Sequence, residues 1–167
     1  EPHDAGVPVH FVRDLAPVAL GELELTPYTV PHDAREPLQL TCTDGDSKLG
    51  ILTDAGSTTA HLVERLQACS ALVLECNHDT QMLRSSRYPP SLKARIAGRL
   101  GHLANDTAAQ ILAACRHPGL RHVVAAHLSE QNNTPGHAAT ALSAALGCHA
   151  DEIIVATPDR GFEWLQA

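Results

Sequence analysis

The sequence predicts an α/β domain in which strands come first and helices then alternate with strands. Three observations support this prediction. Short β-rich runs recur along the chain up to residue 53. Apolar residues with helical spacing then alternate with short apolar runs that are typical of buried strands. Proline, glycine and cap residues stand where the helices would begin and end. Such a β-α-β series folds as helices layered on a sheet.

The opening strands are expected in four β-rich runs. Valine, threonine and tyrosine, which favour strands, are frequent in them. A DGDS turn signal at 44–47 separates the last two runs. The runs are VPVHFV at 7–12, LELTPYTV at 23–30, LQLTCT at 38–43 and KLGILT at 48–53.

The middle of the chain is expected to hold two helices, at 58–69 and 89–100, on either side of a buried strand, ALVLEC at 71–76. Both helices repeat apolar residues on one side, and the second begins with prolines that suit a first helical turn. The residues that would line these faces are Leu62, Leu66 and Cys69 in the first helix and Leu92, Ile96 and Leu100 in the second.

The last third of the chain is expected to add two helices and three strands. Thr134 would cap the second of these helices, Pro135 suits its first turn, and Gly147 would end it. The expected elements are helices at 105–115 and 134–146 and strands at 122–126, 152–157 and 161–166.

Composition indicates a soluble, cytoplasmic protein. With 44% apolar residues, a chain of 167 residues can bury a core, and no apolar run reaches the roughly 18 residues of a membrane crossing. The five cysteines include no C-x-x-C pair, so a zinc site built from thiolates is not expected. Cys69, Cys76 and Cys115 lie in apolar surroundings and are expected to be buried and reduced.

Charge is distributed unevenly along the chain. The net charge of −7 argues against a surface that coats nucleic acid in general. Between Asp79 and Asp106, however, there is no acidic residue, and this window holds a cluster of basic ones. A local basic patch suits a phosphate-bearing substrate. A solvated helix face is the alternative interpretation. The basic residues are Arg84, Arg87, Lys93, Arg95 and Arg99.

Residues with metal-binding chemistry follow several predicted strands. Asp54, His78 and His127 each come after a predicted buried strand, and His32 follows a strand-like run. Ligands gather at the carboxyl ends of strands in α/β sheets. Imidazole nitrogen and carboxylate oxygen suit zinc, manganese or iron. Each residue has a structural alternative, because Asp54 could cap a helix and His127 could order a turn.

Five motifs in order give the sequence a resemblance to a known family. Together they resemble the YycJ-like (WalJ-like) branch of the metallo-β-lactamase superfamily, from about residue 22 to at least residue 146. The motifs are VPHDAREP at 30–37, ILTDAG at 51–56, LECNHD at 74–79, YPPSLKARIAGRLGHLAND at 88–106 and AHLSEQNN at 126–133.

The resemblance implies a site for two divalent metal ions, zinc or manganese, at one edge of an αββα sandwich. By motif position, His32 corresponds to a single histidine ligand, Asp54 to the bridging aspartate and His127 to the final histidine. Glu75 and His102 resemble the catalytic residues of relatives that process tRNA ends. The resemblance also suggests substrate-binding or positioning roles for His78, Asn132 and Asn133. The basic window, rather than the resemblance, adds Arg84, Arg87 and Lys93 as residues that would bind the substrate's phosphates.

One family motif is missing. No H-x-H-x-D-H occurs in these 167 residues, so the ligands that it supplies are absent. Residues 1–167 are therefore expected to be the C-terminal portion of a single metallo-β-lactamase-fold domain that lacks its N-terminal β-layer. The exposed half-sandwich would tend to associate, so an oligomer is possible.

The resemblance and the basic window together predict a metal-dependent hydrolase. A nuclease-type phosphodiesterase is favoured, in which two metals activate a hydroxide that attacks DNA or RNA. This chain alone is expected to be inactive. Two alternatives remain open at this point: a hydrolase of small esters or thioesters, and a non-catalytic, metal-free scaffold.

Overall fold

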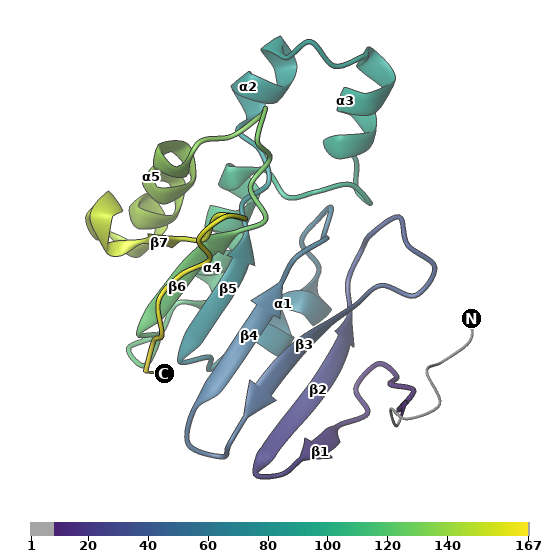
Figure 1. Cartoon of the computed structure of the whole chain (residues 1–167), viewed down its shortest axis with the longest axis vertical. Helices are drawn as coiled ribbons and strands as arrows, with labels where there is room; N and C mark the ends of the chain where they lie inside the picture. Colours follow the sequence, from purple (N-terminus) through teal and green to yellow (C-terminus); the bar gives the residue numbers. More distant parts are fainter. Residues whose placement is uncertain (1–8, 167) are drawn as a thin grey trace.

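The computed structural model describes residues 9–166, and its centre is one mixed sheet of seven strands in sequence order (Figure 1). Strands β1 to β4 pair antiparallel, and β4 to β7 pair parallel. Because β2 and β4 both run antiparallel to β3, the carboxyl ends of β2, β4, β5 and β6 point to one edge of the sheet. The strands are β1 Val18–Leu20, β2 Leu23–Thr29, β3 Leu38–Thr43, β4 Lys48–Leu52, β5 Ala71–Glu75, β6 His122–Ala126 and β7 Ile154–Val155.

The helices form two groups. Helices α1, α4 and α5 cover one face of the sheet, whereas α2 and α3 lie beyond the carboxyl ends of the strands (Figure 1). No helix in the described part of the chain combines the length and apolar character that a membrane crossing requires. The helices are α1 Ala60–Leu66, α2 Thr80–Ser85, α3 Pro90–Ile96, α4 Asn105–Cys115 and α5 Pro135–Leu146, with a 3-10 turn at Ala150–Glu152.

The core lies between the sheet and the helices α1, α4 and α5. Leu52, Leu74 and Ala125 are neighbours in the pairing register and are fully buried. They share one buried cluster with Leu62 of α1 and Leu112 of α4. Full burial of one leucine contributes about 1.5–3 kcal/mol, so this layer holds the strand ends in place.

The predicted state of the cysteines is confirmed. Cys69, Cys76 and Cys115 are at most 1% exposed, and all five cysteines are free. Burial raises the pKa of Cys76 to about 12 and that of Cys115 to about 11. These thiols are therefore protonated and chemically inert near neutral pH.

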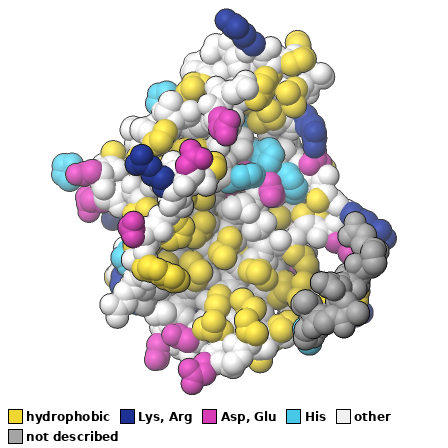
Figure 2. All heavy atoms as spheres, in the orientation of Figure 1, with side chains coloured by type: hydrophobic (Ala, Val, Ile, Leu, Met, Phe, Trp, Pro, Cys, Tyr) yellow, Lys and Arg dark blue, Asp and Glu magenta, His cyan; other side chains and the backbone are white. Residues whose placement is uncertain are grey.

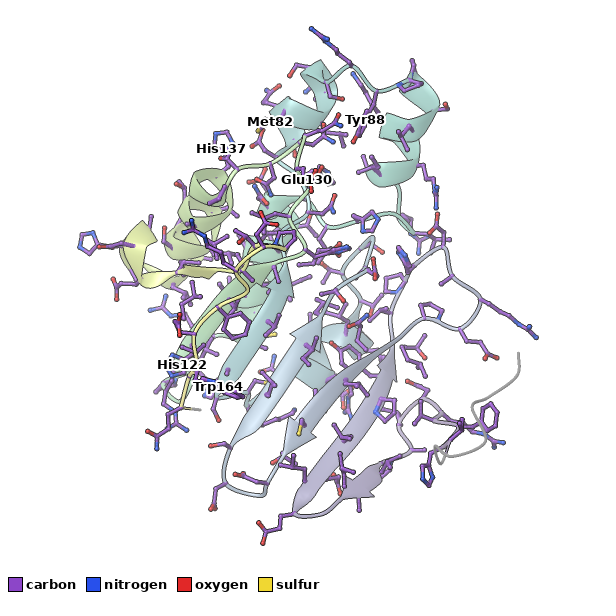
Figure 3. All side chains as sticks on the ribbon, in the orientation of Figure 1. Met82, Tyr88, His122, Glu130, His137 and Trp164 are labelled. Carbon is purple, nitrogen blue, oxygen red and sulfur yellow. The ribbon has the colours of Figure 1, made fainter. Side chains whose placement is uncertain are left out.

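The opposite face of the sheet is apolar and only partly covered. Leu40, Ile51 and Val73 share this face by their pairing register, and each is partly exposed. The segment 162–165 crosses over β4 to β6 and borders a groove of about 360 Å³. Figure 2 shows hydrophobic side chains gathered on this face, and Figure 3 shows Trp164 on the crossing segment. An apolar face of this kind is typical of a surface that packs against another layer.

The α/β fold class is confirmed, as are the caps of α5. The Thr134 side chain accepts a hydrogen bond from the His137 N–H group, and Gly147 ends the helix with a left-handed φ of 70°. Two predicted strands are wrong. Residues 9–12 form no strand, while 7–8 lie outside the described residues, and 161–166 form no strand either. Strand propensity takes effect only with a partner strand, and neither segment pairs with a strand of the sheet.

Other elements differ in extent. The strand predicted at 152–157 is reduced to β7, because the 3-10 turn takes up the residues before it, and β1 and α2 were not predicted. None of the residues Pro90–Ile96 of α3 is buried. The predicted apolar face of this helix is wrong for Leu100, which lies beyond the helix end and is 51% exposed, whereas Leu92 and Ile96 lie on the helix and are partly buried. Because α3 lies off the sheet, no core is available for it to cover.

Candidate metal centre

Five polar side chains meet at the carboxyl edge of the sheet. Asp54 follows β4, Glu75 ends β5, and His127 follows β6, so parallel pairing brings these three together. His32 follows β2, and His102 lies in the loop between α3 and α4. Figure 2 shows histidine side chains beside an acidic one above the apolar sheet face. The topology thus gathers residues that are distant in the sequence.

The Asp54 carboxylate is the common neighbour of three imidazoles. Its Oδ1 lies 3.8 Å from Nε2 of His32, 3.7 Å from Nδ1 of His102 and 3.7 Å from Nδ1 of His127. These distances exceed those of hydrogen bonds. Two atoms that bind one zinc ion at about 2.0–2.2 Å in tetrahedral geometry lie roughly 3.3–3.6 Å apart. Nδ1 of His102 and of His127 is hydrogen-bonded to Glu75, so only the distance from Nε2 of His32 to Asp54 compares with that spacing. The set of imidazole and carboxylate donors fits zinc or manganese.

The backbone at two of these positions is strained. Asp54 has a φ of 50° and His127 a φ of 57°, both in the left-handed region. Non-glycine residues in such regions cost about 1–3 kcal/mol and cluster at functional sites. At both positions the chain turns sharply at a strand end, which directs the two side chains toward the shared site.

Glu75 is a fully buried carboxylate that binds two of the histidines. Its Oε1 accepts hydrogen bonds from Nδ1 of His102 at 2.8 Å and from Nδ1 of His127 at 2.9 Å. Its Oε2 accepts the backbone N–H groups of Ala55 at 2.9 Å and Leu103 at 3.4 Å. Burial raises the pKa of Glu75, but these hydrogen bonds outweigh it and lower the pKa below its ordinary value. The hydrogen bond to Glu75 raises the pKa of His127, against the opposing effect of burial.

Hydrogen bonds fix the tautomer of each histidine. Nδ1–H of His102 and of His127 donates to Glu75, and Nδ1–H of His32 donates to the carbonyl oxygen of Gly101 at 2.9 Å. Each neutral ring then keeps an unprotonated Nε2. A carboxylate or carbonyl partner on one ring nitrogen is the usual support of a metal-binding histidine.

Asp54, Glu75, His102 and His127 form a group that can hold a metal ion, with ligand atoms within 4.8 Å of one another. This set shares Asp54 and His127 with the ligands that the sequence predicts. It adds Glu75, whose oxygens already accept four hydrogen bonds, and His102, whose Nδ1 is bound to Glu75. His32 lies as near to Asp54 as the other two histidines do.

Two glycines allow the loops of the centre to touch. A Cβ atom on Gly56 would meet the carbonyl oxygen of Arg99 at 2.5 Å and also the backbone nitrogen of Gly101. The N–H group of Gly56 donates to the carbonyl of Pro31 at 2.7 Å. Gly56 therefore ties the Asp54 loop to the loops that carry His32 and His102.

Solved structures of similar architecture share one fold. The metallo-β-lactamase fold protein YhfI of Bacillus subtilis matches 92% of this chain and 54% of that chain, with a TM-score of 0.67 and 16% identity. A diphosphatase of the PhnP family matches 95% and 49%, with a TM-score of 0.61 and 16% identity. Zn²⁺-bound PqqB of Methylobacterium extorquens matches 87% and 52%, with a TM-score of 0.56 and 18% identity. The fold is therefore of the metallo-β-lactamase type.

Sequence relatives are more specific. Over 113 residues the chain is 37% identical to exodeoxyribonuclease YycJ of Bacillus anthracis. The aligned residues make up 68% of this chain and 43% of that protein. The chain is YycJ-like. It is 30% identical over 113 residues to exodeoxyribonuclease WalJ of Streptococcus pneumoniae, covering 68% and 42%. This YycJ-like chain thus spans less than half the length of the curated relatives that it matches. No protein-family model matches it.

Three residues of the YycJ-like motifs lie inside the protein. His78 is 3% exposed, Asn132 1% and Asn133 6%. The Asn133 side chain donates to the carbonyl of Cys76 at 2.7 Å and exchanges two hydrogen bonds of 2.9 Å with the side chain of Asn105. The carbonyl of Asn132 accepts the N–H group of Asp79 at 2.8 Å. Burial and these bonds favour loop-positioning roles for both asparagines over direct substrate contact. Burial also lowers the pKa of His78.

The basic residues of the YycJ-like chain lie on and between α2 and α3, the two helices beyond the sheet edge. Arg84 and Arg87 are exposed. Lys93 bridges the helices, because its Nζ donates to the carbonyl oxygen of Arg84 at 2.7 Å. Figure 3 shows Met82 and Tyr88 in the same region. One acidic residue lies against this basic group, because Asp33 contacts Arg95 of α3.

Sequence reasoning missed Asp33 and Asn105. Asp33 accepts a hydrogen bond from Nε of Arg95 at 2.6 Å, and its other oxygen lies 3.6 Å from Nε2 of His32. The Arg95 guanidinium beside Asp33 holds the pKa of that carboxyl below its ordinary value. Asp33 directly follows His32 in the PHD motif, which was the available signal. The pairing of Asn105 with Asn133 spans 28 residues and has no local signature.

Proposed function

We propose that the full-length protein is a metal-dependent phosphodiesterase of the nuclease type, with DNA as substrate. One observation carries the proposal. Carboxylates and imidazoles from separate loops, those of Asp54, Glu75, His102 and His127, bring possible ligand atoms within 4.8 Å of one another, and Nε2 of His32 lies 3.8 Å from Asp54. The relatives named exodeoxyribonucleases support the choice of reaction and substrate.

We propose His32, Asp54 and His127 as metal ligands. The bond from His32 to the Gly101 carbonyl leaves Nε2 of His32 unprotonated near Asp54, which is the form that a metal requires. Oδ1 of Asp54 is the common neighbour of the imidazoles of His32, His102 and His127, so Asp54 would be the central ligand residue of the centre. When bound, zinc or manganese would activate water and neutralise charge on phosphoryl oxygens. Three ligands are few for two cations, so other parts of the full-length protein would complete the centre.

We assign Glu75 and His102 to proton control. Glu75 is fully buried, and its hydrogen bond with Nδ1 of His102 holds that ring in place with Nε2 directed away from Glu75. A protonated His102 would carry a proton on Nε2 and donate it to the departing oxygen of the phosphodiester. The ring centroid of His102 lies 5.2 Å from that of His32 and 5.3 Å from that of His127, so its position between the proposed ligands suits this task.

The α2–α3 region supplies cationic contacts in this proposal. Arg84, Arg87 and Lys93 would bind the phosphate backbone of DNA on either side of the bond that is cleaved. Affinity should then fall steeply as salt concentration rises, because each neutralised phosphate releases condensed counterions.

The experiment compares metal-loaded full-length protein on duplex DNA, single-stranded DNA, RNA and a small thioester. We expect hydrolysis of DNA and little of the thioester. Asp54→Ala should abolish this hydrolysis, whereas Asp46→Ala, which changes an exposed turn residue at the other edge of the sheet, should preserve it. Full activity of the Asp54→Ala variant would contradict the proposal. Preferred cleavage of the thioester would favour the small-ester alternative.

We also propose that residues 1–167 are the C-terminal portion of one metallo-β-lactamase-type domain. The partly exposed apolar face around Ile51 and Val73 supports a second β-layer that packs there in the full-length protein. A dye that binds apolar surface should then fluoresce with the isolated chain and not with the full-length protein. The free, buried cysteines support a reducing compartment, which we propose to be the cytoplasm.

A further inference from the structure

A polar pocket lies beside the metal centre, beneath α2. Its volume is about 270 Å³, and it is bordered by α2, by the first turn of α4 and by the loop that carries His102. The residues with polar side chains that border it are His78, Thr80, Arg84, His102 and Thr107. We call this space the His78 pocket.

The wall of the His78 pocket suits an anion. It presents imidazoles, hydroxyls and one guanidinium, and the nine residues that line it include no acidic one. The nearest acid along the chain, Asp79, has its Oδ1 engaged by the N–H group of Met82 at 2.8 Å, where it caps α2. Within residues 9–166, the Arg84 guanidinium makes no hydrogen bond or ion pair, so it is free for a ligand. Guanidinium and hydroxyl donors are the usual partners of phosphate.

His78 provides an independent sign of a ligand. His78 borders the pocket and is 3% exposed, yet its buried Nδ1 has no hydrogen-bond partner within residues 9–166. Buried polar atoms without partners are rare in folded proteins and call for an explanation. The backbone of His78 is fixed, because it forms a bridge with Ala104 and its carbonyl accepts the N–H group of Asn105 at 2.9 Å. These backbone contacts fix the position of His78 beside the pocket.

The pocket and the metal centre share His102. His102 borders the pocket, while its Nδ1 lies 3.7 Å from Oδ1 of Asp54. A group in the pocket and a phosphodiester at Asp54 would therefore both lie beside His102.

We infer that the His78 pocket binds the terminal phosphate of the DNA strand whose next phosphodiester bond lies at Asp54. The inference rests on the proposed function and adds the group that selects the strand end. The phosphate would accept hydrogen bonds from Thr107 and Arg84, and the pocket volume leaves room for part of the terminal sugar. The polarity of the strand follows from which end must carry the phosphate.

The test uses three duplexes of one sequence, with a 5′-phosphate, a 3′-phosphate or only hydroxyl groups at the ends. With metal-loaded full-length protein, we expect one of the two phosphates to raise kcat/KM about tenfold over the hydroxyl-ended duplex, the size of one charge-assisted contact. Arg84→Ala and Thr107→Val should bring this ratio close to one. Arg116→Ala, which removes an exposed arginine at the far end of α4, should leave the ratio unchanged.

A binding measurement separates the pocket from the reaction. Fluorescence anisotropy in the presence of a chelator, with the same three duplexes, requires no turnover. We expect tighter binding of the phosphate-ended duplex that is preferred in cleavage, and loss of this preference in the Arg84→Ala and Thr107→Val variants. Equal affinity for all three duplexes would overturn the inference. Absence of all cleavage would instead contradict the proposed function, while the binding comparison would still decide the role of the pocket.

Discussion

Replacing Glu75 with glutamine separates the charge of this buried carboxylate from its shape. The carboxylate accepts four hydrogen bonds, two from the backbone N–H groups of Ala55 and Leu103 and two from histidine rings. The backbone donors cannot change, so the glutamine oxygen must replace Oε2 and its NH₂ group must replace Oε1. That NH₂ group then donates to Nδ1 of His102 and His127. Both rings are forced into the tautomer with a proton on Nε2.

The size of the effect follows from these contacts. Two hydrogen bonds to a charged acceptor, each contributing about 1.5–3 kcal/mol, become neutral bonds of about 0.5–1.5 kcal/mol. The free energy of unfolding should fall by at most about 3 kcal/mol, because removing the buried charge offsets part of the loss. Metal binding should suffer more, since His127 can no longer offer Nε2. Loss of a hydrogen-bonded partner behind a ligand typically reduces metal affinity by about 10–100-fold.

The assay has three parts on metal-free full-length protein. Titration calorimetry with Mn²⁺ or Zn²⁺ gives the affinity, urea unfolding gives the stability, and imidazole ¹⁵N NMR shifts report the tautomers. Glu64→Gln, an exposed change on α1, is the matched control and should alter none of them. A Glu75→Gln variant that binds metal as tightly as the parent, with Nδ1–H retained on both rings, would refute the reasoning.

Three other predictions concern the same site. In metal-free protein the Glu75–His127 pair should give maximal stability between the two pKa values. Its contribution is lost as pH falls through the lowered pKa of Glu75. It is also lost as pH rises above the ordinary value of 6.5 through the raised pKa of His127. Urea unfolding across this range checks the prediction, and a flat profile would contradict it. Gly56→Ala should lower stability by about 1–3 kcal/mol and weaken metal binding, because its Cβ meets the backbone of Arg99. Gly136→Ala, whose Cβ would meet only the Thr134 side chain at 4.0 Å, is the control and should not lower stability. Equal stability of both variants would count against loop contact at Gly56. Asp54→Gly should stabilise the metal-free protein by about 1 kcal/mol, because glycine adopts the left-handed backbone without strain, while metal binding is lost. Thermal unfolding with and without Mn²⁺ measures both effects. A metal-dependent shift in Tm that persists in the variant would contradict the ligand role.

Much of the sheet could be predicted from the sequence because each central strand has partners on both sides. ALVLE at 71–75 and HVVAA at 122–126 are short apolar runs that are buried on both faces, and they became β5 and β6. The outer segments could not be predicted in this way. Phe11 is 90% exposed and Trp164 is 101% exposed, so apolar composition there indicated strands that have no neighbour to pair with.

The positions of Asp54 and His127 near one another could also be expected, because both follow parallel strands of one sheet. The details could not. The bonds that direct each imidazole depend on Glu75, which the sequence marks only as a carboxylate in an apolar strand. The close approach of Gly56 to the loop before His102 joins residues more than forty positions apart, and its cause is steric rather than compositional.

The metal centre itself is tested most directly by anomalous diffraction from crystals of the full-length protein grown with Mn²⁺ or Zn²⁺. The account predicts an anomalous peak about 2.0–2.2 Å from a carboxylate oxygen of Asp54, with a nitrogen of His32 or His127 at similar distance. Loss of that peak in Asp54→Ala crystals should follow. A peak bound elsewhere, or one that stays in place in the Asp54→Ala protein, would contradict the account.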